Sequence, residues 1–585
     1  QASDRFLWDF RRTIAELLAE NHYGVLARAA RAHGLTYYAE ALEDQRPQLG
    51  DDMEMRRHAD IPMGAMWTLP KAGEPKPTYV ADLQGAASVA NIYGKKLVAA
   101  ESFTSFGQPW AFSPRDLKPT ADALFALGVT RPIIHTSPHQ PFTDGRVPGL
   151  ALATVLGQYF SRGETWAEQA RGWTDYLARS SYLLQQGQSQ RDIAYFYGEE
   201  APITGLYGDA PLTDIPAGYA FDFVGADALL TQFSVDIGDL LAKSGVRYPL
   251  LVLGGSSRMM TLPVLRQIAA FAAAGATIVG QKPSGTPSLS DDAAIFQALA
   301  DQLWASGRIH PDMKTALQAR NLTPDWDAGP LTGDLRVLHR RMSDGDLYFI
   351  SNRRHSPLTG EISFRVSGKL AELAHTQTGS IEPASYRIDD GRNHVPLSMD
   401  GNEALFVLFR KPATADKLTL PAPSPQSVLE VKGPWDVRFQ PERGAPPTHR
   451  FEQLVSWTEV AVPGIRYFSG TATYSRTIDL PRSPTLKRRQ VLLDLGEVRD
   501  IAKVIINGQQ AGLLWHPPYR TEITSHLKPG HNRIEVKVTN LWVNRLIGDA
   551  RSETSKITYT QGPTYTADAP LVPSGLLGPV RLLTR

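Results

Sequence analysis

Polar side chains follow four consecutive apolar segments in the first third of the chain, and each of these segments is a candidate β-strand. The residues in question are Glu40, Asp60, Glu101, His135 and the pair His139-Gln140. In barrels of parallel strands, the working side chains lie at the carboxyl ends of the strands, where the loops open to solvent. Carboxylates there can give and take protons during hydrolysis, and imidazole or amide groups can bind hydroxyls. The pattern predicts a site of acid–base chemistry, with Glu101 and Glu40 as its catalytic candidates.

Glu101 is the strongest of these candidates. The small residues Val98-Ala99-Ala100 read as a buried strand, and the carboxylate follows them at once. A charge at the end of an apolar strand is costly unless it is paired or put to use. The structural alternative is a buried salt bridge from Glu101 to Arg131 or Lys118.

Glu40 and Asp60 have weaker contexts. Glu40 follows two tyrosines, and structural pairing and function explain it equally well. Asp60 stands before Ile61-Pro62, where an aspartate can bind substrate or simply cap a turn.

His135, His139 and Gln140 lie in the run IIHTSPHQP, which Pro138 and Pro141 stiffen. A lone histidine usually packs, but this group at a strand end favours binding of sugar hydroxyls. No carboxylate or cysteine accompanies the histidines, so we predict no zinc there. Sugars also need aromatic walls for their apolar ring faces, and Trp67 and Trp110, just past strand ends, are the best candidates, ahead of Phe103 and Trp166.

The elements that must position these residues are parallel βα units. Residues 1–190 alternate helical patterns with short apolar runs. We expect a helix over residues 4–31, strands over 35–41, 60–67, 96–102 and 131–137, and further helices over 81–93, 114–127 and 164–186. Four βα units make half a barrel, whose open edges cannot stand alone. The missing N-terminal half is expected upstream or in another chain, and the helical opening at Gln1, without Met, suggests removal of something upstream.

After residue 190 the pattern of predicted helices and strands changes. Residues 191–310 read as a small doubly wound, flavodoxin-like α/β domain, residues 311–415 as a β-sandwich, and residues 425–585 as a second sandwich. The predicted fold class is therefore multidomain α/β plus all-β, beginning with the C-terminal half of a (β/α)₈ TIM barrel. Asn507-Gly508 predicts a two-residue hairpin. Gly198-Glu199-Glu200 also follows a strand, but it opens the second domain and is expected at an interface, and the glycine loop at residues 254–257 matches no nucleotide-binding motif.

Composition excludes several classes of protein. Lysine plus arginine (61) nearly equals aspartate plus glutamate (60), which argues against a nucleic-acid-binding surface. The absence of cysteine excludes disulfides and thiolate metal sites. No segment approaches the run of about 18 apolar residues that a membrane span requires.

Several separated motifs together resemble glycoside hydrolase family 106, the α-L-rhamnosidases. They occur in one order, and the resemblance is strongest over residues 1–205: DRFLWDFRRT, ADIPMG, AAESFTS, WAFSPRDLK, ALGVTRPIIHTSPHQP, GQYFSRGETW and YLLQQG. The resemblance implies removal of terminal α-L-rhamnose with inversion, for which one acid protonates the leaving oxygen and one carboxylate activates water. It assigns the general base to Glu101, on the seventh barrel strand, and places the general acid on the fourth strand, upstream of this chain.

One departure from the family pattern concerns the strand before Glu101. Many relatives read GEFW where this chain has Gly64-Ala65-Met66-Trp67, so the assisting role of that glutamate is in doubt, with Glu40, Glu54 or Asp60 as substitutes. The resemblance also implies calcium, bound by hard oxygen ligands that we do not assign individually.

The resemblance further implies a bacterial, periplasmic or secreted enzyme acting on flavonoid glycosides or polysaccharide side chains. The balanced charge and the lack of a long apolar run predict no nucleic-acid and no membrane partner. Residues 425–585 resemble galactose-binding-like jelly rolls, in which Trp515 and Trp542 either stack on sugar or pack in the core. Two rivals remain open: a retaining enzyme resembling the β-galactosidases, and a non-catalytic carbohydrate-binding protein on a barrel scaffold.

Overall fold

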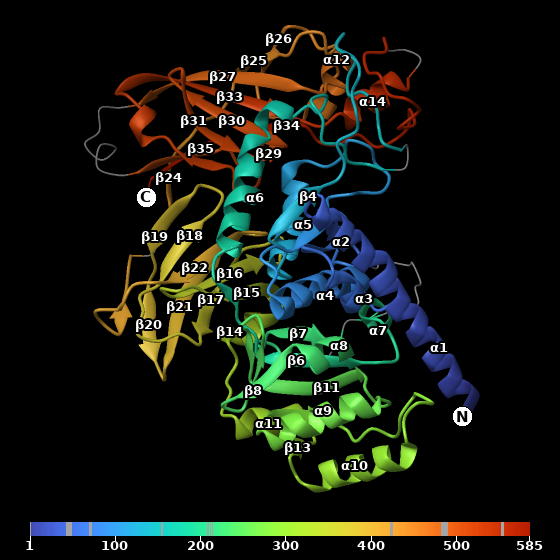
Figure 1. Cartoon of the computed structure of the whole chain (residues 1–585). Helices are drawn as coiled ribbons and strands as arrows, with labels where there is room; N and C mark the ends of the chain where they lie inside the picture. Colours follow the sequence, from blue (N-terminus) through green and yellow to red (C-terminus); the bar gives the residue numbers. More distant parts are fainter. Residues whose placement is uncertain are drawn as a thin grey trace.

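The computed structural model describes most of the chain as a row of packed regions of mixed α/β and all-β structure (Figure 1). The described residues are 2–41, 50–69, 73–153, 156–207, 210, 212, 214–421, 425–480, 490–551 and 555–584. Within these ranges, no helix has both the length and the apolar character to cross a membrane.

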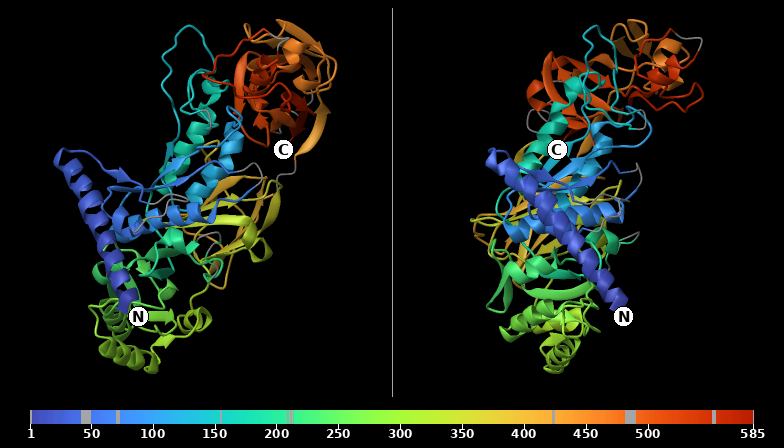
Figure 2. Two further views of the ribbon diagram at one scale, coloured as in Figure 1. Left: turned by 90° about the vertical axis from the view of Figure 1, so that its right-hand side faces the viewer. Right: turned by 45° about the vertical axis from the view of Figure 1, so that its right-hand side comes forward.

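The chain opens with a long helical run that lies along the side of the molecule (Figures 1 and 2). It consists of α1 (Ala2–Leu18), a π-helical turn η1 (Ala19–Gly24) and α2 (Val25–Ala32), close to the single helix expected over residues 4–31. Trp8 on α1 donates its indole N–H to the carbonyl of Glu199 at 3.1 Å, which ties the helix to the second region of the chain.

The four strands predicted in the first region form one parallel sheet in sequence order. They are β1 (Tyr38–Ala39), β2 (Ile61–Met66), β3 (Ala99–Ser102) and β4 (Arg131–Ile134). The helices around the sheet are α3 (Asp52–Arg56), α4 (Pro77–Tyr93), α5 (Pro114–Ala126), the short η2 (Ala167–Gln169) and α6 (Arg171–Leu184). Ser113 and Asp116 form a capping box that starts α5 directly after the loop that follows β3. The predicted strands are confirmed, although β1 is only two residues long.

Both edges of this sheet lack a further strand among the described residues. Large apolar side chains at these edges are exposed: Tyr38 on β1, and Ile133 and Ile134 on β4. The α1 helix likewise exposes an apolar stripe that includes Phe6 and Phe10. The first region therefore presents apolar surface at both edges of its sheet and on α1.

The second region is built on a five-stranded parallel sheet in the order β13-β12-β11-β6-β7. In chain order this is 2-1-3-4-5, the order of flavodoxin-like sheets. Its strands are β6 (Ile193–Gly198), β7 (Phe221–Val224), β11 (Leu250–Ser256), β12 (Thr277–Gly280) and β13 (Ile309–His310). The other elements are α7 (Ile203–Tyr207), α8 (Ala226–Thr231), α9 (Leu262–Ala273), α10 (Ala293–Ala305), α11 (Met313–Ala319), and a small antiparallel sheet of β8 (Phe233–Asp236), β9 (Asp239–Ala242) and β10 (Arg247–Tyr248).

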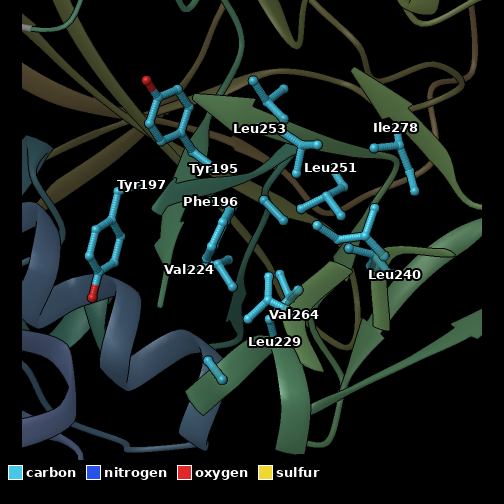
Figure 3. Close-up of a cluster of buried hydrophobic side chains, with 14 of the residues drawn as sticks. Tyr195, Phe196, Tyr197, Val224, Leu229, Leu240, Leu251, Leu253, Val264 and Ile278 are labelled. Atoms are coloured by element: carbon cyan, nitrogen blue, oxygen red, sulfur yellow. The ribbon is translucent and has the colours of Figure 1, made fainter. Parts of the chain in front are cut away.

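The core of this second region is mainly apolar on the helix-covered faces of the sheet. Figure 3 shows Phe196, Val224 and Leu251 of the strands packed with Leu229 and Val264 of the helices. Burial on both faces explains why these strands read as continuous apolar runs in the sequence.

The first all-β region places a five-stranded sheet, in the order β14-β17-β21-β20-β23, against a six-stranded sheet, in the order β19-β18-β22-β16-β15-β5. The elements are β5 (Gln188–Ser189), β14 (Trp326–Asp327), η3 (Gly329–Asp334), β15 (Leu335–Arg341), β16 (Asp346–Asn352), β17 (Leu358–Phe364), β18 (Glu372–His375), β19 (Ser380–Pro383), β20 (Tyr386–Asp389), β21 (Arg392–Met399), β22 (Ala404–Phe409) and β23 (Lys417–Leu418). Strand β5 follows α6 closely in the chain and pairs with β15, so backbone hydrogen bonds connect the end of the first region to this sheet.

The second all-β region has a four-stranded sheet, in the order β24-β35-β28-β32, against a six-stranded sheet, in the order β26-β25-β27-β33-β30-β31. The strands are β24 (Gln426–Glu430), β25 (Trp435–Phe439), β26 (Thr448–Phe451), β27 (Thr471–Leu480), β28 (Val491–Asp494), β29 (Glu497–Arg499), β30 (Ile501–Ile506), β31 (Gln509–Leu514), β32 (Arg520–Glu522), β33 (Gly530–Thr539), β34 (Gly575–Gly578) and β35 (Arg581–Thr584). The short helices are η4 (Trp457–Glu459), α12 (Pro463–Arg466), η5 (Thr524–His526) and α14 (Val543–Asp549).

Two local predictions for this region hold. Asn507 and Gly508 join β30 to β31 with positive φ at both residues, as a two-residue hairpin requires. Trp515 and Trp542 are each only 1% exposed, so of the two alternatives core packing is correct.

Candidate active site

Glu101 lies on β3 in the interior of the four-stranded sheet. Its Cα is level with Ala65 of β2 and Ile133 of β4. The preceding residues Ala99 and Ala100 are buried, whereas the Glu101 side chain is 24% exposed. The carboxylate therefore emerges from an apolar strand into partly open space, as its sequence context predicts.

One oxygen of the Glu101 carboxylate carries its hydrogen bonds. The Trp67 indole N–H donates to Oε1 at 3.0 Å, and the Thr104 hydroxyl donates to the same atom at 2.7 Å. Within the described part of the chain, no hydrogen bond reaches Oε2. Because two donors fix the orientation of the carboxylate through Oε1, the other oxygen is left to accept a proton from a bound molecule.

His135 extends this arrangement. Its Nδ1 lies 2.9 Å from the Thr104 hydroxyl oxygen and 3.8 Å from Glu101 Oε1. The Thr104 hydroxyl has one proton, and if it is donated to Glu101, His135 must carry its proton on Nδ1. The Nε2 of a neutral His135 is then an acceptor, suited to a sugar hydroxyl.

The proposed structural alternative for Glu101 is wrong for Lys118. That lysine is buried and donates to Asp122, its neighbour one turn along α5, at 2.7 Å, and to the carbonyl of Asn402. Arg131 is exposed on β4, and the described residues include no ion pair between it and Glu101. The glutamate is therefore not neutralised by either cation.

An aromatic surface lies beside Glu101. Trp67 follows β2 and is partly exposed, and the Phe106 ring, 62% exposed, lies 4.7 Å from it between centroids. The prediction of Trp67 is consistent with this position. Phe106 and Thr104 were missed by the sequence reasoning, although their place in the ESFTSF run directly after β3 was the available signal.

Trp110 is a correction. We predicted it as a second sugar-facing wall, but it is only 1% exposed and packs 4.9 Å from the Tyr159 ring in a cluster with Trp542. Phe103 and Trp166 are buried as well. The Trp110 ring is turned inward because Trp542 and Leu546 of the second all-β region supply an apolar surface for it.

Asp60 is also a correction, because it lies at the wrong end of its strand. Strand β2 begins at Ile61, so Asp60 precedes the strand, and the residue at the carboxyl end is Trp67. The Asp60 carboxylate pairs with Arg31 at 2.8 Å and accepts the Tyr37 N–H at 2.9 Å. Burial acts to raise the Asp60 pKa, but the Tyr37 amide and Arg31 outweigh it and lower that pKa. These contacts favour the structural alternative for Asp60 over substrate binding.

Glu40 directly follows β1 and is half-buried. Ala39 pairs with Pro62, and Met63 pairs with Ala99, so Glu40 comes level with the start of β3 and not with Glu101. Burial lowers the pKa of the Arg56 guanidinium, and the negative charges of Asp52 and Glu40 act in the opposite direction. Glu40 therefore lies in the field of a buried cation, and its catalytic role stays a prediction.

The two remaining predicted residues, His139 and Gln140, differ in whether their side chains are already engaged within the protein. His139 is exposed on the loop after β4, and its role in sugar binding stays a prediction. The Gln140 amide is occupied at both ends, because its Nε2 donates to the Leu150 carbonyl at 2.7 Å and its Oε1 accepts the Leu150 N–H at 2.8 Å. We therefore leave Gln140 out of the site and assign it to the loop's own structure.

The place of the family glutamate is taken by Ala65, whose methyl group is buried level with Glu101. Glu54, a suggested substitute, lies on α3 and pairs with Arg12. Burial and the neighbouring charge of Asp51 raise the pKa of Glu54 to about 7. The Glu54 carboxyl is therefore engaged by Arg12, and an assisting role for it stays a prediction.

The expected calcium ion has no ready site in the described part of the chain. No group of three or more His, Asp or Glu side chains there is arranged to hold a metal ion. Calcium also takes backbone carbonyl and amide oxygens as ligands, so calcium stays a proposal, and we derive no step through it.

Comparison with known proteins places the chain in a family of glycoside hydrolases. The model of glycoside hydrolase family 106, described as α-L-rhamnosidase, matches residues 1–388. Because this is more than half of the chain, the chain belongs to that family, and the resemblance in its motifs is confirmed.

One solved structure and one curated protein are similar to this chain over its whole length. The solved structure of a rhamnosidase from Novosphingobium sp. PP1Y is 48% identical with a TM-score of 0.94, and the match covers 100% of this chain and 56% of that one. The chain thus spans little more than half the length of that relative. A curated Formosa agariphila protein named "Putative beta-glucuronidase" is 26% identical, over 100% of this chain and 70% of its own length.

Proposed function

We propose that this chain supplies the water-activating part of an exo-acting glycoside hydrolase that removes terminal α-L-rhamnose from glycosides with inversion of configuration. Family membership supports the substrate class. The observation that carries the mechanism is the one-sided hydrogen bonding of Glu101, which holds Oε1 and leaves Oε2 for a reacting molecule.

In the proposed reaction, Glu101 is the general base. Water on one face of the sugar gives a proton to Oε2 while its oxygen attacks the anomeric carbon, and a carboxylic acid on the opposite face protonates the leaving oxygen. The two donors on Oε1 hold the carboxylate in place as it changes from charged to neutral. The two carboxyl groups would stand about 6.5–9.5 Å apart, to leave room for the water.

The sugar would be recognised by the residues around Glu101. The Trp67 and Phe106 rings offer an apolar surface to one face of the rhamnose ring. His135 Nε2 would accept a hydroxyl hydrogen, because its Nδ1 proton is engaged with Thr104. Terminal rhamnose on flavonoid glycosides or polysaccharide side chains is the expected substrate, and a periplasmic or secreted bacterial enzyme is the expected setting.

We further propose that the four-stranded sheet is the C-terminal half of a (β/α)₈ barrel. Its open edges and the exposed side chains Tyr38, Ile133 and Ile134 support this arrangement, because exposed strand edges and apolar patches of this kind are normally covered. The covering half, with the general acid, would come from the N-terminal side of the natural protein or from another chain.

A panel of aryl glycosides tests the proposal in the natural protein. We expect hydrolysis of 4-nitrophenyl α-L-rhamnopyranoside and background rates for the β-D-galactoside and β-D-glucuronide. Faster cleavage of either β-glycoside would favour the retaining alternative, in which the carboxylates stand about 5 Å apart. No cleavage of any glycoside would favour the carbohydrate-binding alternative.

Calcium remains a proposal that rests on the family alone. Dialysis against a strong chelator is expected to lower the rate on the rhamnoside and added calcium to restore it. An unchanged rate after chelation would dismiss the ion.

A further inference from the structure

The segment that follows α14, residues 555–573, leaves the second all-β region and lies against the two loops that leave β3 and β4. We name these the C-terminal segment, the β3–α5 loop (residues 103–113) and the β4–α6 loop (residues 135–153 and 156–166). In Figure 1 the β4–α6 loop reaches up to the part of the chain around α14.

Tyr559 holds the β4–α6 loop through its backbone and its ring. Its N–H donates to the Val147 carbonyl at 2.7 Å, and its carbonyl accepts the Gly149 N–H at 3.1 Å. The Arg146 guanidinium lies over both the Phe142 and the Tyr559 rings, 4.6 and 5.3 Å from their centroids. These contacts fix the outer part of the loop on which His139 lies.

Tyr565 holds the β3–α5 loop. Its hydroxyl donates to the Pro109 carbonyl at 2.8 Å. Next to it, Trp110 and Tyr159 pack against Trp542 and Leu546 of the second all-β region in one buried cluster. Trp542 also donates its indole N–H to the Gly163 carbonyl at 2.8 Å.

The two loops are joined to each other as well. Gly157 donates its N–H to the Ser105 carbonyl at 2.8 Å and accepts the Trp110 N–H at 2.6 Å. A Cβ at residue 157 would lie 2.0 Å from the Gly107 carbonyl oxygen, so only glycine permits this approach. A displacement of one loop would therefore shift the other as well.

The same loops carry the side chains around Glu101. Thr104 and Phe106 belong to the β3–α5 loop, and His135 begins the β4–α6 loop. We infer that the C-terminal segment is a positioning element of the glycosidase site, in which Tyr565 and Tyr559 hold the loops that orient Glu101 and bind the sugar. This inference rests on the proposed function, and it makes the second all-β region a working part of the site.

Tyr565→Phe tests the inner contact, because it removes only the hydroxyl that donates to Pro109. The loss of one hydrogen bond is expected to lower kcat on the aryl rhamnoside about threefold to tenfold, with KM within about twofold, because Thr104 loses its position on Glu101. Tyr386→Phe is the matched control, since the Tyr386 hydroxyl donates to the Ala415 carbonyl at 3.1 Å in the first all-β region. An unchanged kcat in Tyr565→Phe, or an equal fall in both variants, would overturn the inference.

Tyr559→Ala tests the outer contact without requiring turnover. Amide hydrogen exchange in residues 135–166 is expected to rise at least about tenfold, with the exchange of the strands unchanged, and KM is expected to rise while kcat stays within about twofold. Unchanged exchange in this loop would overturn the inference. Faster exchange in a natural protein that cleaves no rhamnoside would leave the loop attachment standing and reject the proposed function instead.

Discussion

Glu101 and Glu199 occupy similar places in two different parallel sheets, yet their surroundings give them different roles. Glu101 is near the end of the apolar strand β3, and Glu199 directly follows the apolar strand β6. Both oxygens of Glu199 are occupied by Thr261 at the start of α9, its N–H at 2.7 Å and its hydroxyl at 3.2 Å. Burial raises the pKa of Glu199. Glu101 is held through one oxygen only, so a strand-end carboxylate is available for chemistry when its partners leave an oxygen unused.

The largest expected effect separates these two glutamates. Glu101→Gln should lower kcat on the aryl rhamnoside about a thousandfold, because removal of a general base typically costs about 10²–10⁴-fold. Glu199→Gln should leave kcat within about threefold and lower the melting temperature instead, since Glu199 holds Thr261, the residue that precedes α9. Steady-state kinetics and thermal unfolding of both variants check this. Near-normal turnover in Glu101→Gln would remove that residue from the mechanism.

A smaller effect is expected from the donor on Glu101. Trp67→Phe keeps an aromatic ring beside Phe106 but removes the N–H that donates to Oε1. Because a hydrogen bond to a charged group contributes about 1.5–3 kcal/mol, kcat/KM should fall at least about tenfold. Trp304→Phe is the control, since that indole donates to the Gly280 carbonyl in the second region. Equal kinetics in the two variants would show that the Trp67 N–H does not act on Glu101.

The smallest effect is a change of stability with pH that involves a third carboxyl group, Glu164. Burial of this side chain favours its neutral form. It is 5% exposed, and burial raises its pKa well above the usual 4.5, although Gln158 donates to it. Because the folded pKa is higher than the unfolded one, the native state binds more protons, and stability falls as pH rises above about 4.5, by at most about 1.4 kcal/mol per pH unit.

Glu164→Gln mimics the neutral form and should remove this loss. The difference in melting temperature between the variant and the wild type should therefore be smallest near pH 4 and should grow in favour of the variant over the range above about pH 4.5. A constant difference across this range, or a variant that becomes relatively less stable as pH rises, would contradict the assignment of a neutral Glu164.

The same contrast explains how much the sequence could predict. The four strands, Glu101 at the end of β3 and the Asn507-Gly508 hairpin depend on neighbouring residues, and local pattern was enough to find them. Asp60 was assigned to the wrong end of β2, because an apolar run in the sequence does not show whether a polar residue beside it precedes or follows the strand. Strand boundaries had to be known before its role could be read.

Trp67 and Trp110 show that the local sequence pattern does not predict which aromatic side chains are buried by distant parts of the chain. Both follow strands and look alike in the sequence, but Trp110 is buried by Trp542, which lies far along the chain in another region. Thr104 was missed for a similar reason, because a hydroxyl three residues after a glutamate carries no signal until the loop brings it back to the carboxylate. Residues that depend on distant contacts needed the structure.

The configuration of the first-formed sugar tests most directly whether a water activated by Glu101 attacks the anomeric carbon. Proton NMR of the natural protein acting on an aryl α-L-rhamnoside should show β-L-rhamnose first, with the α-anomer appearing only by later mutarotation. Initial release of α-L-rhamnose would mean two successive inversions through a covalent intermediate, and Glu101 could not then be the base of a single displacement.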